Sequence, residues 1–255
     1  MVLEVFQMSE SIKVLSTQLR LPYLKENAHL HLEQARLENK SYEDFLIEIL
    51  EYEIALKNQN SVKNRIKRAK FPYHKTLDEL VIDELPDGAK QQYQSLRSLD
   101  FISSHQNIIL AGNPGTGKTH ISIGLGLKAC MAGYNVYFTH VPDLIIRLKE
   151  AQNERTLGSL KKRFEKYELI ILDELGYISF DKEGAELLFN LISSRTECAA
   201  TIFTTNLSFD RWDEIFHDKV LTAAIVDRIT HHSYVINMNG ESYRLKQSTS
   251  LKRTI

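Results

Sequence analysis

The sequence predicts an α/β fold in which a five-stranded parallel sheet lies between helices, preceded by a small all-helical N-terminal domain. Two patterns support this prediction. From residue 107 onward, short apolar runs alternate with helical stretches, which is typical of crossover units and a parallel sheet. From Ile12 to Leu56, apolar residues instead recur at helical spacing, with charged residues between them and no strand-like alternation.

The expected strands are short apolar segments, and helices are expected between them. The strands are 107–111, 135–139, 169–172, 200–204 and 233–237. The helices are 118–132, 143–166, 183–194 and 218–229. Gly133 is expected to end the first of these helices, and a break is expected near Gly158 in the second, because glycine favours helix ends over helix interiors.

Three segments are expected along the 255 residues: a helical N-terminal domain at 1–58, a basic linker at 59–75 and the α/β domain at 76–255. The run 57–75 holds seven lysines and arginines and no acidic residue, and it contains Phe71-Pro72, a step that disfavours helix. Charge pattern alone leaves open a solvated linker or a contact with nucleic acid. In the second case, the candidate contacts are Lys67, Arg68 and Lys70.

Composition sets limits on the function. The formal net charge is only -1, so any binding of nucleic acid must come from local basic patches. The start of the chain is neither basic nor followed by a long apolar core, and no window approaches the roughly 18 apolar residues of a membrane span. We therefore expect a cytoplasmic protein with no membrane partner. Cys130 and Cys198 lack the spacing of a disulfide framework or zinc site, and both are expected in the core.

A phosphate-binding loop is the strongest motif in the sequence. The run 112–119 fits G-x-x-x-x-G-K-[ST] and stands between an expected strand and an expected helix, as the motif requires. Backbone N–H groups and the helix N-terminus would surround the phosphates of ATP, Lys118 would reach the β and γ phosphates, and Thr119 would hold Mg²⁺. The expected nucleotide contacts are Gly112, Asn113, Pro114, Gly115, Thr116, Gly117, Lys118, Thr119 and His120.

Two adjacent carboxylates follow the expected strand 169–172. Mg²⁺ prefers oxygen ligands, and hydrolysis needs a positioned water, so an acidic residue is expected at the end of a neighbouring buried strand. Asp173 fits the Mg²⁺-side carboxylate and Glu174 fits a general base, a pair that favours hydrolysis over transfer. The alternative is that these acids only cap a helix.

Further polar residues are expected near the same carboxyl edge of the sheet. Asn206 follows the strand 200–204 and would orient the attacking water, unless it is only a turn residue. Arg228 and Arg244 lie late in the chain and offer guanidinium groups to phosphate charge, one of them in trans. Each arginine taken alone is also compatible with a surface ion pair.

These motifs together resemble the AAA+ ATPases of the DnaC and IstB group, over about residues 67–244. The sequence is most similar to IstB, the helper ATPase of insertion-sequence transposition, through Lys-Phe-Pro at 70–72, Asp-Glu-Leu-Gly-Tyr at 173–177 and Asn-Leu-Ser-Phe-Asp-Arg-Trp at 206–212. The resemblance implies an AAA+ P-loop fold and ring or spiral assembly of copies. It also implies that Asn206 is the sensor-one residue, Arg228 the arginine finger and Arg244 a sensor-two-like arginine. No separate C-terminal lid domain is expected, because the sequence stops soon after Arg244.

A net positive helical stretch lies at 144–166. In the initiator-type ATPases that this sequence resembles, the corresponding position lines the DNA channel, whereas the alternative is an exposed charged helix. The candidate DNA contacts in this stretch are Arg147, Arg155, Lys161, Lys162 and Arg163.

The expected function is that of an ATPase that forms homo-oligomers on duplex DNA with little regard to sequence. It would select or remodel target DNA and act on a partner transposase, as the resemblance implies. A DnaC-like replicative helicase loader remains an alternative, although the absence of cysteine before Cys130 excludes a zinc-bearing N-terminal module. A small-molecule kinase would need neither Glu174 beside Asp173 nor an arginine supplied in trans.

Overall fold

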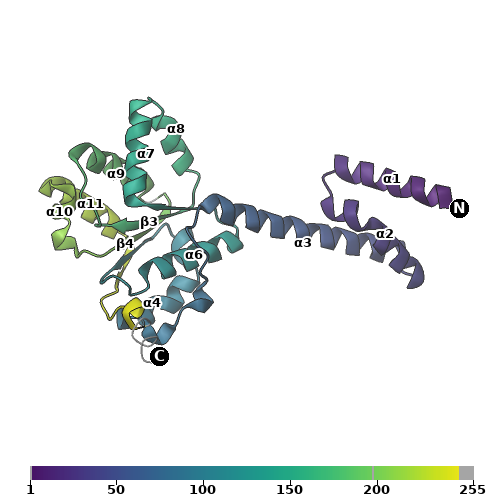
Figure 1. Cartoon of the computed structure of the whole chain (residues 1–255), viewed down its shortest axis with the longest axis horizontal. Coiled ribbons are helices and arrows are strands. Elements are labelled where there is room, and N and C mark those ends of the chain that lie inside the picture. The colour runs from purple at the N-terminus through teal and green to yellow at the C-terminus, as the bar shows by residue number, and fades with distance from the viewer. Residues whose placement is uncertain (1, 197, 247–255) are drawn as a thin grey trace, which may run out of the picture. The chain divides into compact units, whose positions relative to one another are not determined.

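The computed structural model describes residues 2–196 and 198–246. The chain divides into two compact units, Met1–Asn64 and Arg65–Ile255. Helices dominate the first unit, and the second contains the sheet (Figure 1). Within the described residues, no helix has the length and apolar character needed to cross a membrane.

The first unit consists of α1 (Val2–Gln18), α2 (Pro22–Leu37) and α3 (Tyr42–Ala69) as far as Asn64. The start of α2 is stabilised from a neighbouring helix, because the buried carboxylate of Glu53 on α3 accepts hydrogen bonds from the backbone N–H groups of Tyr23 at 2.9 Å and Leu24 at 3.1 Å. These are donors that the first turn of a helix cannot satisfy internally. The helices expected over 12–56 are therefore present.

Helix α3 differs from the expected linker. It continues through Ala69, so that most of the segment 59–75 is helical, and the division between units falls after Asn64. No proline or glycine occurs between Tyr42 and Ala69, and Lys67 and Arg68 favourably occupy the negative C-terminal end of the helix.

The second unit is built on one parallel sheet with strand order β2-β3-β4-β1-β5. The strands are β1 (Asn107–Ala111), β2 (Val136–His140), β3 (Leu169–Leu175), β4 (Ala200–Thr205) and β5 (Ser233–Asn237). All five predicted strands are confirmed, although β2 begins and ends one residue later than expected and β3 and β4 extend further. Their carboxyl ends share one edge of the sheet, which is where α/β proteins bind ligands.

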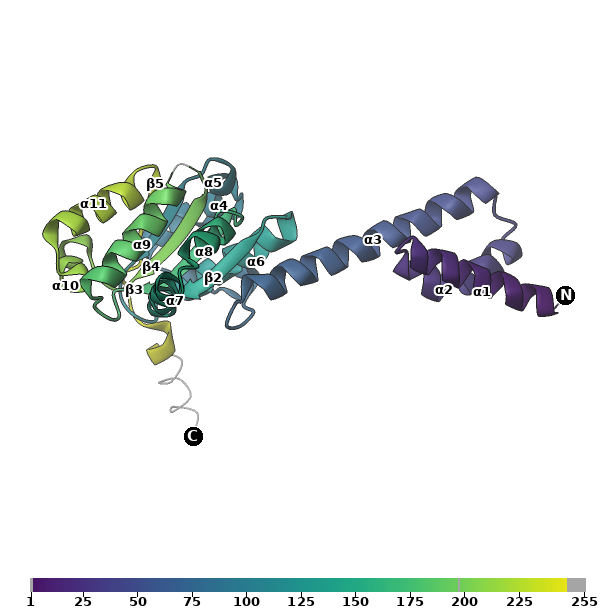
Figure 2. The same cartoon turned by 90° about the horizontal axis from the view of Figure 1, so that it is seen from above.

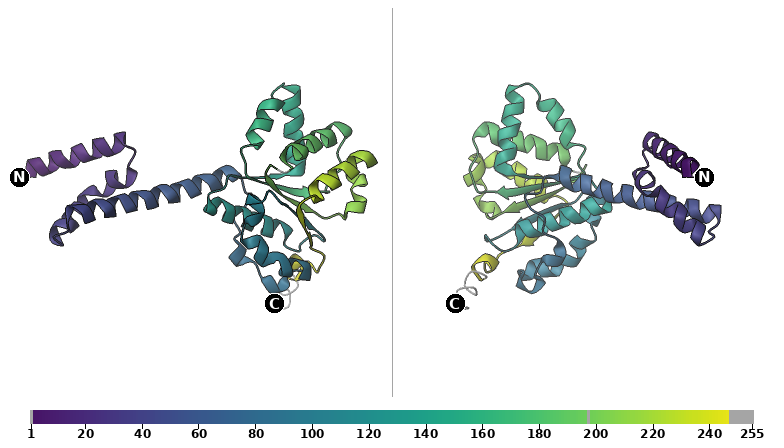
Figure 3. Two further views of the ribbon diagram at one scale, coloured as in Figure 1. Left: turned by 180° about the vertical axis from the view of Figure 1, so that it is seen from behind. Right: turned by 45° about the vertical axis from the view of Figure 1, so that its right-hand side comes forward.

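Helices cover both faces of the sheet (Figures 1 and 2). One face packs α4 (Asp87–Arg97), α5 (Asp100–Ser103) and α6 (Lys118–Ala132) against side chains such as Ile108 and Leu110. The other packs α7 (Val141–Asn153), α8 (Leu157–Phe164), α9 (Lys182–Arg195), α10 (Asp213–Phe216) and α11 (Lys219–Thr230) against Ile109 and its neighbours. Figure 3 shows the same two layers from two further directions.

Three local features differ from the expectations. The stretch 143–166 is broken close to the expected position, but the break lies at Arg155, which adopts a left-handed conformation with φ of 58°, and Gly158 itself lies inside α8. The helices α4 and α5 lie in a segment for which no element was expected. Cys130 is buried as expected, but Cys198 is exposed because it lies in the turn between α9 and β4.

Candidate active site

The phosphate-loop motif forms the connection from β1 to α6 and is packed tightly against the end of the described chain. Gly115 has φ of 81°, and a Cβ atom there would lie 2.1 Å from Oγ of Ser242. A Cβ on Gly112 would lie 2.2 Å from the backbone of Met238. Only glycine fits both positions, for steric as well as conformational reasons. The loop backbone also pairs with this segment, because the N–H of Tyr243 donates to the carbonyl of Gly115 at 3.0 Å.

Lys118 begins helix α6 and is partly enclosed by the loop. Its Nζ donates to the carbonyl oxygens of Gly112 and Asn113, both at 2.6 Å. Burial lowers the pKa of Lys118 to about 8, an effect that the nearby Asp173 carboxylate opposes and the Arg244 charge reinforces. When protonated, the Lys118 side chain is therefore a cation held by the phosphate loop and close to the Asp173 carboxylate.

Asp173 and Glu174 lie near the end of β3, and Asp173 meets the first turn of α6, directly after the phosphate loop. The hydroxyl of Thr119 lies 3.1 and 3.2 Å from the two carboxylate oxygens of Asp173, which is 1% exposed. A hydroxyl and a carboxylate so placed are the oxygen ligands that Mg²⁺ prefers, so the residues present fit this ion. Glu174 is more exposed and lines the adjoining cavity.

A residue that the sequence did not indicate completes this cluster. His140 ends β2 and pairs in register with Asp173 across the sheet. Its Nδ1 lies 3.5 Å from a carboxylate oxygen of Asp173 and 3.5 Å from one of Glu174, and this buried nitrogen has no hydrogen-bond partner among the described residues. The sequence holds no local signal for His140, because the contact depends on β2 lying next to β3.

A cavity of about 310 Å³ joins these groups. Its wall includes the loop residues Pro114 to His120, together with Glu174, Asn206 and Arg244. The amide oxygen of Asn206 is buried without a hydrogen-bond partner in the described part of the chain, so its capacity to accept a hydrogen bond is unused there. The structure therefore brings together the predicted phosphate loop, carboxylates, Asn206 and Arg244 at one edge of the sheet.

A further part of the cavity wall comes from residues that the sequence did not indicate. It comes from Tyr73, Lys75 and the segment 79–85, which precedes α4. This segment is anchored to the start of α6, because a ring nitrogen of His120 lies 2.8 Å from the carbonyl oxygen of Thr76. No motif marks it, since its residues are a mixture of apolar and charged types that only the fold brings over the phosphate loop.

Arg228 lies outside the cavity that Glu174, Asn206 and Arg244 share. It is exposed on α11, does not line the cavity of its own chain, and places its guanidinium 5.3 Å from the ring centroid of Phe189 on α9. Within the described ranges, no carboxylate forms an ion pair with Arg228. Its position is compatible with contact to another molecule.

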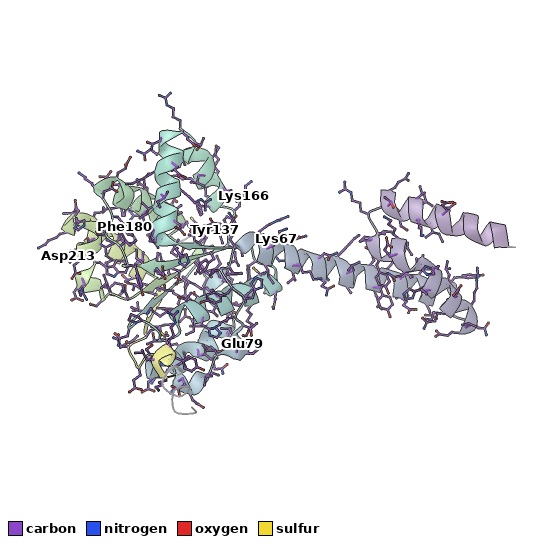
Figure 4. All side chains as sticks on the ribbon, in the orientation of Figure 1. Lys67, Glu79, Tyr137, Lys166, Phe180 and Asp213 are labelled. Atoms are coloured by element: carbon purple, nitrogen blue, oxygen red, sulfur yellow. The ribbon has the colours of Figure 1, made fainter. Side chains whose placement is uncertain are left out.

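The predicted DNA contacts differ in their surroundings. Lys162 and Arg163 on α8 are exposed, as are Arg155, Lys67, Arg68 and Lys70, whereas Lys161 is half-buried. Arg147 is also half-buried, lies over the ring of Tyr137 and donates a hydrogen bond to its hydroxyl. Figure 4 labels Lys67 at the end of α3, Tyr137 on β2 and Lys166 just beyond α8.

The fold is shared by solved structures of the DnaI, DnaC and DnaA proteins. The DnaI structure aligns with a TM-score of 0.54 and 22% identity, covering 64% of this chain and 90% of that chain. The DnaC helicase loader gives 0.52 and 20%, with 69% and 99% coverage. AMPPCP-bound DnaA from Aquifex aeolicus gives 0.56 and 17%, with 72% and 56% coverage. This likeness shows an AAA+ P-loop fold.

Comparison with curated proteins and with a family model identifies the family more specifically than the fold does. The ATP-binding protein named for insertion sequence IS5376 of Geobacillus stearothermophilus is 39% identical over 240 residues, covering 94% of this chain and 96% of the relative. Its counterpart named for IS21 of Pseudomonas aeruginosa is 38% identical over 236 residues, with 92% and 89% coverage. The model of the IstB-like ATP binding protein family matches residues 14–251. This chain therefore belongs to the family of IstB-like ATP-binding proteins.

Proposed function

We propose that this protein is an ATP-hydrolysing, DNA-binding regulator of transposition. It forms homo-oligomers on duplex DNA, selects or remodels the target, and recruits or activates a partner transposase. The observation that carries the proposal is that Thr119 contacts the buried Asp173 and lines one cavity with Glu174, in a member of a family whose curated relatives are named for insertion sequences.

The geometry supports distinct roles for the residues of the site. Lys118 binds the β and γ phosphates, and Thr119 and Asp173 would hold Mg²⁺, which would supply positive charge to the transferred phosphoryl group. Glu174, partly exposed at the cavity, acts as the general base for water, and Asn206 orients that water. Arg244 contributes charge from the same wall. Arg228, which does not line its own cavity, serves the site of a neighbouring copy.

DNA binding is supported by exposed cations on α8 and at the end of α3. Lys162 and Arg163 project from a short helix that Phe164 anchors in the core. Contacts of lysine and arginine with phosphate carry little base information, so the duplex is bound with little regard to sequence. Arg147 contributes less, because Tyr137 already engages its guanidinium.

The proposal is tested by separating ATP binding from hydrolysis. Lys118→Ala should lose ATP binding and, with it, ATP-dependent binding of a fluorescent duplex. Glu174→Gln should bind ATP and DNA normally but hydrolyse ATP about 10² to 10⁴ times more slowly, because only the general base is lost. Nucleotide titration, phosphate release and fluorescence anisotropy measure the three properties.

Equal loss of ATP affinity in both variants would contradict the role of Glu174. Equal duplex binding by the wild-type protein with and without ATP would contradict ATP-dependent DNA binding. A helicase loader with the same core would instead bind a replicative helicase and leave the activity of the transposase unchanged, so strand-transfer assays with and without this protein distinguish the two functions.

A further inference from the structure

The backbone at the end of β3 is irregular where it carries the two carboxylates. The pairing of β3 with β4 shifts register between Leu172 and Leu175. Within this irregularity, Glu174 has φ of 65°, in the left-handed region that residues with a Cβ atom seldom occupy. Such a conformation costs free energy and persists only where the surroundings hold it in place.

The side chain of Thr204 forms hydrogen bonds with both Asp173 and Glu174 at this irregularity. The hydroxyl of Thr204, on the neighbouring strand β4, accepts a hydrogen bond from the backbone N–H of Glu174 at 3.0 Å. The same hydroxyl donates to Oδ1 of Asp173 at 2.5 Å. Because a hydroxyl has one proton and two lone pairs, it can serve both residues at once.

The environment makes this pair of hydrogen bonds difficult to replace. Thr204 is 2% exposed and Asp173 is 1% exposed, so water has little access to take over either bond. Asp173 also meets the hydroxyl of Thr119, so its carboxylate is oriented from two sides, by Thr119 on α6 and by Thr204 on β4.

We propose that Thr204 is a positioning residue for ATP hydrolysis. Its hydroxyl holds the left-handed turn that directs the Glu174 carboxylate toward the cavity, and it fixes the orientation of Asp173 relative to Thr119. This inference rests on the proposed function, in which Glu174 is the general base. Thr204 itself supplies no proton and no metal ligand in this role.

The test compares Thr204→Val, which keeps the shape but loses the hydroxyl, with Thr204→Ser, which keeps the hydroxyl. Thr201→Val is the matched control, because Thr201 is also buried on β4 but lies at the opposite end of the strand from the carboxylates. We expect Thr204→Val to lower kcat about 10- to 100-fold with KM changed less than about threefold, because binding groups are retained and only alignment is lost. Thr204→Ser and Thr201→Val should keep kcat within about threefold of the wild type.

A second comparison separates positioning from general damage to the fold. In the Glu174→Gln background, Thr204→Val should lower the remaining rate far less than in the wild type, since residues that act as a unit are not additive. Thermal unfolding of all variants is measured alongside. Should Thr204→Val not fold, Thr204→Ala takes its place in the same comparisons.

The proposal is overturned if Thr204→Val retains wild-type kcat, if Thr204→Ser loses as much as Thr204→Val, or if Thr204→Val lowers the rate equally in both backgrounds. A different result would contradict the proposed function itself. If Glu174→Gln turned over ATP at the wild-type rate, Glu174 would not be the general base, whatever the effect of the Thr204 variants.

Discussion

At the scale of single residues, the state of Lys118 links nucleotide binding to pH. Burial lowers the pKa of this lysine to about 8, so the side chain loses its proton in the free protein as the pH rises past that value. A bound polyphosphate favours the charged form and raises the pKa again. Above about pH 8, binding of ATP must therefore take up a proton, which weakens the affinity.

We predict that the Kd for ATP is insensitive to this group below about pH 8 and rises above it, by up to about tenfold per pH unit. Titration of Glu174→Gln with a fluorescent ATP analogue, between about pH 7 and pH 9.5, measures the effect without hydrolysis. In the Glu174→Gln background, Lys118→Arg is the control, because a guanidinium stays charged throughout this range. An equal rise of Kd in the arginine variant would assign the pH dependence to another group.

At the scale of elements, the short helix α8 presents cations from a fixed position. Phe164 is buried and Leu157 and Leu160 pack partly against the same core, so the exposed Lys162 and Arg163 project from an anchored helix. Neutralising Lys161, Lys162 and Arg163 to glutamine should weaken duplex binding and flatten the plot of log K against log salt. Each lost phosphate contact reduces the slope by about 0.9.

Fluorescence anisotropy over a salt series measures this slope. Lys182→Gln with Lys219→Gln is the control, because both lysines are exposed on other helices, α9 and α11. The control variant should have the same slope as the wild-type protein, because its two lysines make no contact with DNA in this proposal. An unchanged slope in the α8 variant would exclude this helix from the DNA interface.

At the scale of the whole molecule, the proposed arginine finger, Arg228, is not part of the active site of its own chain. Arg228 is exposed on α11, lies over Phe189 and does not line the cavity that holds Lys118. An arginine supplied in trans is worth roughly 10³ to 10⁵ in rate. We predict that Arg228→Ala alone and Lys118→Ala alone are both inactive, but that a mixture regains part of the ATPase activity.

The mixture regains activity because a Lys118→Ala copy still offers its finger to the intact phosphate loop of an Arg228→Ala neighbour. Phosphate release across mixing ratios measures this complementation, and a mixture of Lys118→Ala with Glu174→Gln is the control that should stay inactive. If subunits exchange and every ratio of the first pair remains inactive, Arg228 acts within its own chain or supports the fold.

Much of the fold could be predicted because its signals are local. Apolar runs of strand length gave all five strands, and the phosphate-loop motif and Asp173-Glu174 were recognised from consecutive residues. The continuation of α3 through Ala69 was missed, because the basic charge of the segment 59–69 was interpreted as a linker although nothing in it breaks a helix. The break expected near Gly158 in the stretch 143–166 falls at Arg155, just before that glycine.

What the sequence by itself determined is the set of chemical groups: a phosphate loop, two carboxylates, an amide and several arginines, each carried by a short motif. Only the tertiary structure decided their neighbours. The strand order β2-β3-β4-β1-β5 places His140 on one side of Asp173 and Thr204 on the other, and the fold lays the segment 79–85 across the cavity. These contacts join residues about 30 or more positions apart in the chain, and they arise from strand pairing and burial, which no local pattern encodes.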